Sequence, residues 1–349
     1  RWDNARDLQG DIDIVIKRST DKGVLWKPML TVLDMKEWGG LPEKYNGVSD
    51  ANILVDRETG KIFIFALWMH GVLDPETGEW VEGLTSESTV WNHQWAKNGS
   101  KVGVGLKESS QFMMITSEDD GITWSEPTNL TPLLKKIEWS LLAPAPGHGI
   151  TLADGTLVVP VQGRDKKGVP FSTIMSSKDH GKTWNVGRPA SVNTTESMAV
   201  ELSDGTVMLN IRDNRNAEAN AKINGRSIFT TTDLGETWQE HPTSRKALIE
   251  PLCMGSIHKH TYTVGEEEKS ILLFMNPNSK TERNNLTIKV SFDDGNTWPE
   301  AYNILLDEVG GYGYSCITSI DEGAIGVLYE SSVADMTFQR ISLEELIFK

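Results

Sequence analysis

The chain has 349 residues, of which 38% are hydrophobic, and its 49 acidic and 34 basic side chains give a net charge of −15. No apolar run approaches the roughly 20 residues that a membrane-spanning helix needs, and the negative charge argues against nucleic acid or an anionic membrane as a partner. The two cysteines, Cys253 and Cys316, lack the spacing of a metal site or a disulfide framework, so we expect two buried core thiols.

The first predicted strand is the run D-I-D-I-V-I-K at 11–17, which leads directly into the octet S-T-D-K-G-V-L-W at 19–26. The octet returns as S-E-D-D-G-I-T-W (117–124), S-K-D-H-G-K-T-W (177–184), T-T-D-L-G-E-T-W (231–238) and S-F-D-D-G-N-T-W (291–298). We expect the Asp to accept hydrogen bonds from backbone N–H groups one or two residues on, the Gly to adopt a positive φ and the Trp ring to cover the turn. A calcium loop would need a different ligand spacing and a Glu at its twelfth position, so the octet indicates a structural β-turn.

The tryptophans that end the last four octets lie 60, 54 and 60 residues apart, which is enough for one four-stranded blade of a β-propeller. The interval from Trp26 to Trp124 is 98 residues, and its excess predicts an insertion near 70–110. Apolar runs joined by Asp-Gly or similar turns, as at 149–162, 198–212 and 316–330, predict strands of a meander. Only 131–139 hints at a helix. We therefore predict an all-β fold, a six-bladed β-propeller that occupies 1–349 as one domain.

The last blade offers three candidate strands, at 314–320, 324–330 and 336–342. A propeller commonly closes with a strand from the other terminus, which removes the open sheet edge. We expect the last blade to mix both chain ends, and the first blade to lack its beginning in the sequence as given.

Topology then selects candidate functional residues. If strands A to D run outward from the axis and the octet forms the C–D turn, then the start of A, the end of B and the B–C loop lie on the opposite face. The residues at these places are Asp50, Glu196 and Tyr314 (starts of A), Arg212 and Glu330 (ends of B), and Asp7 and Arg283 (B–C loops). Two arginines suit a carboxylate-bearing ligand, and a Tyr beside a Glu suits a phenol activated by a neighbouring base.

Each residue also has a plainer interpretation. Arg212 could pair only with Asp213, Glu330 could be an exposed strand-end charge, Asp50 a turn cap and Tyr314 a core aromatic. That all seven pass one topological criterion argues against coincidence.

The motifs N-T-T-E, L-N-I-R-D-N-R, R-N-N-L-T-I-K, G-Y-S and V-L-Y-E-S-S occur in this order among the octets, and with them the chain resembles bacterial exo-α-sialidases (neuraminidases), six-bladed propeller glycosidases with repeated Asp boxes. The resemblance implies a set of roles: Arg212 and Arg283 in an arginine triad that grips the sialic acid carboxylate, Tyr314 as nucleophile, Glu196 as its base, Asp7 as acid/base, Glu330 orienting the first triad arginine, and Asp50 and Arg1 lining the O4 side of the site. Arg6, Asp11 and Asp13 compete with Asp7 on position alone.

The family's F-R-I-P motif, whose Arg completes the triad, does not occur in this sequence, and we expect it upstream of Arg1. The resemblance implies retaining hydrolysis through a tyrosine nucleophile, sialylated glycans as partners, no cofactor or metal, and a secreted, periplasmic or cell-surface location. Two alternatives stay open: a trans-sialidase, inter- or intramolecular, and a non-catalytic glycan-binding propeller. The pairing of Tyr314 with Glu196 favours an enzyme, since a binding module does not need it.

Overall fold

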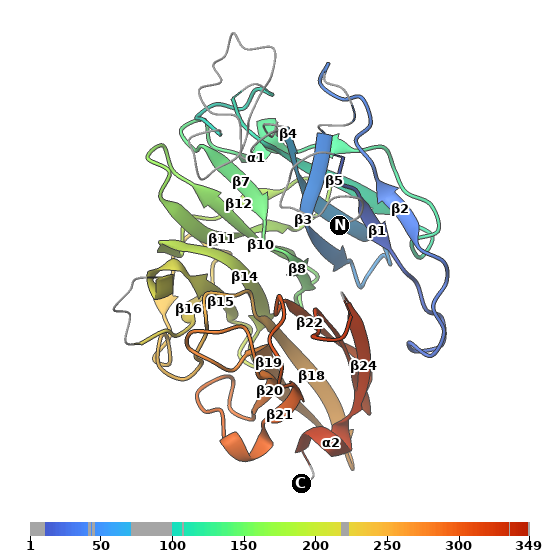
Figure 1. Cartoon of the computed structure of the whole chain (residues 1–349), viewed down its shortest axis with the longest axis vertical. Coiled ribbons are helices and arrows are strands. Elements are labelled where there is room, and N and C mark those ends of the chain that lie inside the picture. Colours follow the sequence, from blue (N-terminus) through green and yellow to red (C-terminus); the bar gives the residue numbers. More distant parts are fainter. Residues whose placement is uncertain are drawn as a thin grey trace. The chain divides into compact units, whose positions relative to one another are not determined.

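Antiparallel β-sheets make up most of the structure, a computed structural model that describes residues 11–40, 43, 46–70, 100–106, 108–217, 223–334 and 336–347 (Figure 1). The chain divides into two compact units. Unit 1 takes residues 1–19, 26–171 and 176–186, and unit 2 takes residues 20–25, 172–175 and 187–349. The single domain that the sequence suggests over 1–349 stays a prediction.

The described strands form one two-stranded sheet and five sheets of three to six strands. The two-stranded sheet pairs β1 (Ile14–Ile16) with β2 (Leu30–Leu33). The first larger sheet contains β3 (Asn46–Val55), β4 (Ile62–His70), β5 (Gln111–Ser117), β6 (Thr128–Asn129) and β8 (Gly147–His148), and the second contains β7 (Leu141–Pro144), β9 (Ile150–Thr151), β10 (Leu157–Arg164), β11 (Pro170–Ser177), β12 (Asn185–Val186) and β13 (Ser191–Val192). The third contains β14 (Thr194–Glu201), β15 (Val207–Asp213), β16 (Ser227–Thr231) and β17 (Gln239–Glu240), and the fourth contains β18 (Ser256–Val264), β19 (Glu267–Pro277), β20 (Leu286–Ser291) and β21 (Ile304–Asp307). The fifth contains β22 (Ser315–Asp321), β23 (Ala324–Tyr329) and β24 (Thr337–Ser342). The all-β class is confirmed, and these five sheets are propeller blades made mainly of antiparallel strands; two of the five have the predicted four strands.

The predicted strand runs become the observed strand pairs. The run at 198–212 forms β14 and β15, joined by an Asp-Gly turn in which Thr206 donates its N–H to Asp204 Oδ1 at 2.9 Å. The octet at 19–26 lies between β1 and β2, which pair antiparallel as the two outer strands of a blade should. The three runs predicted at the C-terminal end become β22, β23 and β24. The fourth strand expected for that sheet from the other terminus stays a prediction.

The four full octets fold into the same turn. At 177–184, Ser177 Oγ donates to Asp179 Oδ1 at 2.8 Å, and Thr183 donates its N–H and its hydroxyl to the two carboxylate oxygens at 2.9 and 2.6 Å. The N–H group thus comes from four residues on, not from the one or two residues predicted. The reason is that His180 and Gly181 both have positive φ, 58° and 78°, which turns the chain back over the carboxylate.

The tryptophan that ends each full octet covers its turn. In three copies its indole N–H donates to the octet glycine's carbonyl, at 3.3 Å for Trp124, 3.1 Å for Trp184 and 3.2 Å for Trp298. Trp238 instead donates to the carbonyl of Arg188 at 2.9 Å. The octet therefore fixes the turn, while the partner of its indole depends on the neighbouring chain.

The helix predicted over 131–139 is only one turn long. α1 (Thr131–Leu134) has a proline in its first turn and ends where Lys135 adopts an extended conformation, with ψ 125°. The Lys135 ammonium donates to the carbonyl of Gly103, so its side chain is drawn to a neighbouring loop. This tertiary contact outweighs the local helical tendency of L-L-K-K.

The C-terminal helix α2 (Leu343–Ile347) was not predicted. It starts with a capping box, in which Glu345 N donates to Ser342 Oγ at 3.2 Å and Ser342 N donates to Glu345 Oε2 at 2.8 Å. Short 3₁₀ turns also occur among the described residues, at Asn214–Ala217 and Glu300–Tyr302. Among the described residues, no helix is long and apolar enough to cross a membrane.

The core of unit 2 lies between consecutive sheets. Apolar side chains of β14, β15 and β16 pack against those of β18 and β19, as Met208, Ile257 and Phe274 do. The other face of β18–β21 packs against β22–β24, through residues such as Ile288 and Val327. Because the sheets pack face to face in chain order, the starts and ends of their strands gather at common edges.

Candidate active site

Glu196 and Arg212 meet across the first two strands of the sheet β14–β17. N-T-T-E begins β14 and L-N-I-R ends β15, and the antiparallel register pairs Thr194 with Asp213, with an irregularity between Thr194 and Ser197 that contains Glu196. Arg212 Nη1 donates to Glu196 Oε2 at 2.6 Å, with their side chains 18% and 11% exposed. Strand pairing alone thus builds a largely buried, charge-assisted hydrogen bond at this edge.

Tyr314 joins this pair from just before β22. Its hydroxyl donates to Glu196 Oε1 and accepts a hydrogen bond from Arg212 Nη1 at 3.1 Å. The turn that delivers it needs Gly313, whose φ is +84° and where a Cβ would lie 2.8 Å from Pro277 Cγ. A carboxylate, a guanidinium and a phenol from three separate segments therefore share one set of hydrogen bonds.

The charges in this cluster support each other. Burial by itself lowers the pKa of Arg212, but the charges of Glu196 and Tyr314 outweigh burial and raise that pKa above its ordinary value. Arg212 thus stays cationic, and its guanidinium, 3.1 Å from the phenol oxygen, can stabilise negative charge that develops there.

Arg283, in the loop between β19 and β20, is fixed beside Tyr314. Its Nη1 donates to the carbonyl of Tyr312 at 2.9 Å and its Nη2 to the carbonyl of Leu252 at 3.1 Å. Its guanidinium carbon lies 5.8 Å from the centroid of the Tyr314 ring, within cation–π distance. Both predicted arginines are therefore held near the phenol, by a carboxylate in one case and by two carbonyls in the other.

Glu330 follows β23 and is tied to the backbone of Tyr314. Glu330 N donates to Tyr314 O at 3.0 Å, and Tyr314 N donates to Glu330 Oε2 at 3.0 Å. This carboxylate helps to fix the main chain that carries the phenol. The role predicted for it, orienting a further arginine, stays a prediction.

Asp50 belongs to unit 1, where it interrupts β3. The register between β3 and β4 shifts between Ser49 and Asn52, Asp50 has a φ of 54°, and Ser49 Oγ donates to Asp50 Oδ1 at 3.4 Å. A non-glycine residue in the left-handed region is uncommon and is often found at functional positions. Its predicted contact with substrate stays a prediction.

Arg1, Arg6 and Asp7 lie outside the described residues. Asp11 and Asp13, which compete with Asp7 for the acid/base role, are described. Their carboxylate oxygens lie within 4.8 Å of one another and of a carboxylate oxygen of Asp34. Acidic groups on a protein surface often gather in this way, and the cluster by itself indicates no metal.

Sequence reasoning missed a layer of charged groups behind Arg212. Asp213 is fully buried and pairs with Arg215 at 2.6 Å and with Arg245, so the interpretation of Arg212 as a mere partner of Asp213 is wrong. Behind it, Arg226 Nη1 donates to Glu250 Oε2 at 2.6 Å, and both side chains are 0% exposed. Arg226 immediately precedes the strand S-I-F-T-T, and a charge at a strand end gives no sequence signal that it is buried.

Cys253 lies close to this charged layer. Its thiol is buried, and burial raises its pKa to about 12, so it is not a nucleophile at neutral pH. Burial also raises the pKa of the Cys316 thiol to about 12, although the residue as a whole is partly exposed, and both cysteines are free.

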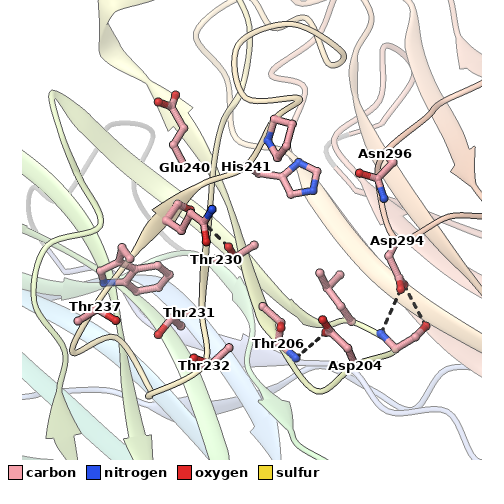
Figure 2. A pocket seen from close by; sticks show the side chains of 15 residues that line it. Asp204, Thr206, Thr230, Thr231, Thr232, Thr237, Glu240, His241, Asp294 and Asn296 are labelled. Carbon is pink, nitrogen blue, oxygen red and sulfur yellow. Dashed lines mark hydrogen bonds between the residues drawn. The ribbon is translucent and has the colours of Figure 1, made fainter.

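A cavity of about 690 Å³ lies elsewhere in unit 2 (Figure 2). It is lined by the β14–β15 turn, with Asp204 and Thr206, and by the octet turns that contain Thr237 and Asp294. These turns are at the opposite strand ends from Glu196 and Arg212. The cavity is therefore separate from the cluster around Tyr314.

Comparison with known proteins gives a family match and several similar proteins. A family model described as a BNR repeat-like domain matches residues 2–327. A sialidase of Bacteroides fragilis (strain YCH46) is 42% identical over 347 residues, 99% of this chain and 59% of that protein. A sialidase of Micromonospora viridifaciens is 31% identical over 336 residues, 93% of this chain and 46% of that protein.

Among solved structures, the Hadza microbial sialidase Hz136 is 42% identical, with a TM-score of 0.86, over 99% of this chain and 62% of that chain. The chain thus spans roughly half to three fifths of the length of these relatives.

Proposed function

Because this chain belongs to the BNR repeat-like domain family and is similar to sialidases along almost its whole length, we propose that it is an exo-α-sialidase, a glycoside hydrolase that releases terminal sialic acid from glycans. The observation that carries the proposal is the contact of the Tyr314 hydroxyl with the Glu196 carboxylate, with Arg212 bonded to both. A module that only binds glycans has no need for a phenol beside a base.

The substrate's own charge explains why a phenol is the nucleophile. Sialic acid carries a carboxylate on its anomeric carbon, so an anionic Asp or Glu would approach a negative charge. A tyrosine is neutral until it loses its proton, and Arg212, 3.1 Å from the phenol oxygen, stabilises the charge that develops there. Arg212 and Arg283 together supply the positive charge that the substrate carboxylate requires.

The proposed reaction has two steps and retains the configuration. In the first, the Tyr314 proton passes to Glu196 Oε1 while the phenol oxygen attacks the anomeric carbon, and the glycosidic bond breaks as Asp7 gives a proton to the leaving oxygen. The product is a covalent sialosyl-tyrosine. In the second, Asp7 takes a proton from a water molecule that attacks the anomeric carbon, the carbon–phenol bond breaks, and the proton held by Glu196 returns to Tyr314.

Two further proposals concern the setting of the site. The proposed substrates are sialylated glycans and glycoproteins. An enzyme that acts on them is proposed to be secreted, periplasmic or on the cell surface. The fold is proposed to be a six-bladed propeller, with β1 and β2 as the outer strands of a blade, supported by their pairing around an octet and by the five larger sheets.

The test compares wild type with Tyr314→Phe on an α-2,3-sialoside. Wild type should release sialic acid, with the α-anomer appearing first by ¹H NMR, and Tyr314→Phe should lose several orders of magnitude in kcat, since only the phenol oxygen is removed. A fluorinated sialosyl fluoride should label wild type, and peptide mapping should place the adduct on Tyr314. Full activity in Tyr314→Phe, or a label on Glu196, would overturn the mechanism, and a 2,7-anhydro product would identify an intramolecular trans-sialidase instead.

A further inference from the structure

The buried ion pair between Arg226 and Glu250 lies where two supports of the arginines meet. Glu250 Oε1 accepts a hydrogen bond from the backbone N–H of Asp213 at 2.7 Å, and Asp213 directly follows Arg212. The same oxygen accepts from Asn216 Nδ2 at 2.6 Å. Glu250 thus fixes the main chain at the end of β15, next to Arg212, whose side chain contacts the phenol of Tyr314.

The same pair also fixes the segment that supports Arg283, residues 250–253, which we call the strap. Arg226 Nη1 donates to Glu250 Oε2 at 2.6 Å and to the carbonyl of Cys253 at 2.7 Å, so the guanidinium clamps both ends of the strap. Between these ends, the carbonyl of Leu252 accepts the bond from Arg283 Nη2 at 3.1 Å.

The backbone of the strap indicates that its conformation is imposed. Leu252 has a φ of +55°, in the left-handed region that residues with a Cβ rarely adopt. Such a conformation persists only when the surrounding structure over-determines it. Here the surrounding structure is the clamp by Arg226, whose Nε also donates to Asn210 Oδ1 at 2.7 Å.

We infer that the Arg226–Glu250 pair is a positioning device that sets Arg212 and Arg283 relative to one another, and with them the geometry of carboxylate binding. Neither residue touches the substrate in this account. The inference rests on the proposed function, because it assigns the two arginines to a substrate carboxylate. A buried charge pair contributes little net stability compared with an apolar pair of similar volume, so stability alone does not account for this pair. Positioning Arg212 and Arg283 gives it a function.

The test removes the pair as a whole, because removing one partner would leave an unpaired buried charge. Arg226→Met with Glu250→Leu replaces it by apolar side chains of similar size, which leaves neither member of the pair as an unpaired buried charge. Arg226→Met with Glu250→Gln keeps a side-chain oxygen for Asp213 N but loses the clamp on Cys253. Ile341→Ala, in the outer strand β24 and 3% exposed, is the control for a general loss of stability.

The readout, by calorimetry, is the dissociation constant of the carboxamide of the 2,3-unsaturated sialic acid analogue divided by that of the acid itself. In wild type the acid should bind more tightly than the amide. In the double variant with Glu250→Leu this ratio should fall at least about tenfold, which is the scale of losing one hydrogen bond to a charged group. In the double variant with Glu250→Gln it should fall by less. Ile341→Ala should lower Tm and leave the ratio unchanged.

A ratio within twofold of wild type in both double variants would overturn the inference. If the double variant with Glu250→Leu does not fold, the double variant with Glu250→Gln is the deciding measurement. It lacks the Arg226 clamp on Cys253, so the contribution of Arg283 to binding of the acid should still be lost. A wild-type protein that binds the acid no better than the amide refutes the proposed function itself, and this inference with it.

Discussion

Lys289→Met should make the protein more stable at pH 7 and less stable at high pH. Lys289 lies in β20 and is 5% exposed. Its ammonium donates to Asn276 Oδ1 at 2.9 Å and lies 5.4 Å from the centroid of the Phe274 ring. An amide oxygen carries no charge to offset a buried cation, and burial, together with the nearby positive charge of Arg226, lowers the pKa of Lys289 from 10.5 to about 7.

The size of the effect follows from this shift. A group whose pKa is lower in the folded protein than in the unfolded chain binds fewer protons when folded, so stability rises with pH between about 7 and 10.5. At 1.36 kcal/mol for each pKa unit, keeping Lys289 costs on the order of 4 kcal/mol at pH 7 and almost nothing above pH 10.5. Methionine avoids this cost but leaves Asn276 Oδ1 without its donor, which costs about 2 kcal/mol.

The expected outcome is a crossover. Lys289→Met should be about 2 kcal/mol more stable than wild type at pH 7, and less stable by a similar amount above pH 10.5. Urea unfolding of both proteins at pH 7, 8.5 and 10.5, read by tryptophan fluorescence, measures the difference and cancels the titration of other groups. A difference that does not change with pH would show that Lys289 is not desolvated as described, and a variant less stable at pH 7 would refute the argument.

Three further predictions concern the site and the octets. Glu196→Gln should lower kcat for natural and aryl α-sialosides alike, because the phenol loses its base in both; an effect confined to natural substrates would contradict this. Asp7→Ala should spare aryl sialosides with good leaving groups, since these need little protonation, and equal losses on both substrates would exclude Asp7 as the acid. Hydrogen bonds from Thr183 and Ser177 lower the pKa of Asp179 to about 2 from 3.8, so the stability they provide is present above about pH 4 and lost as the pH falls towards 2. Asp179→Asn should therefore lower Tm at pH 7 without changing kcat, with a difference from wild type that shrinks between pH 4 and pH 2; a constant difference would refute this.

Local chemistry explains what the sequence could predict of the fold. The octet turn is built from hydrogen bonds that span at most four residues, such as Gly181 N to Ser177 Oγ at 2.8 Å, so a motif of eight residues contains its own structure. Regular spacing of such turns, with apolar runs between them, was enough to predict the all-β class and strand pairs such as β14 with β15. The prediction of a helix over 131–139 was too long because the Lys135 side chain bonds to the carbonyl of Gly103, in a loop that is distant in the sequence.

Topology also selected residues that the structure brings together. The starts of A strands and the ends of B strands share an edge, which predicts that Glu196, Arg212 and Tyr314 lie close together. Their side chains share hydrogen bonds in the structure. Their roles in catalysis stay predictions.

Only the tertiary structure could decide the rest. Phenol and base are 118 positions apart, and no local pattern says that a proton passes between them. Glu250 in A-L-I-E-P has the sequence context of a loop residue, yet it is fully buried because Arg226 and the backbone of Asp213 neutralise and bond its carboxylate. Trp238 ends an octet like its counterparts and still bonds to Arg188, 50 residues away. A turn satisfies its own hydrogen bonds, whereas a buried charge or an indole takes whichever partner the packed chain brings within reach.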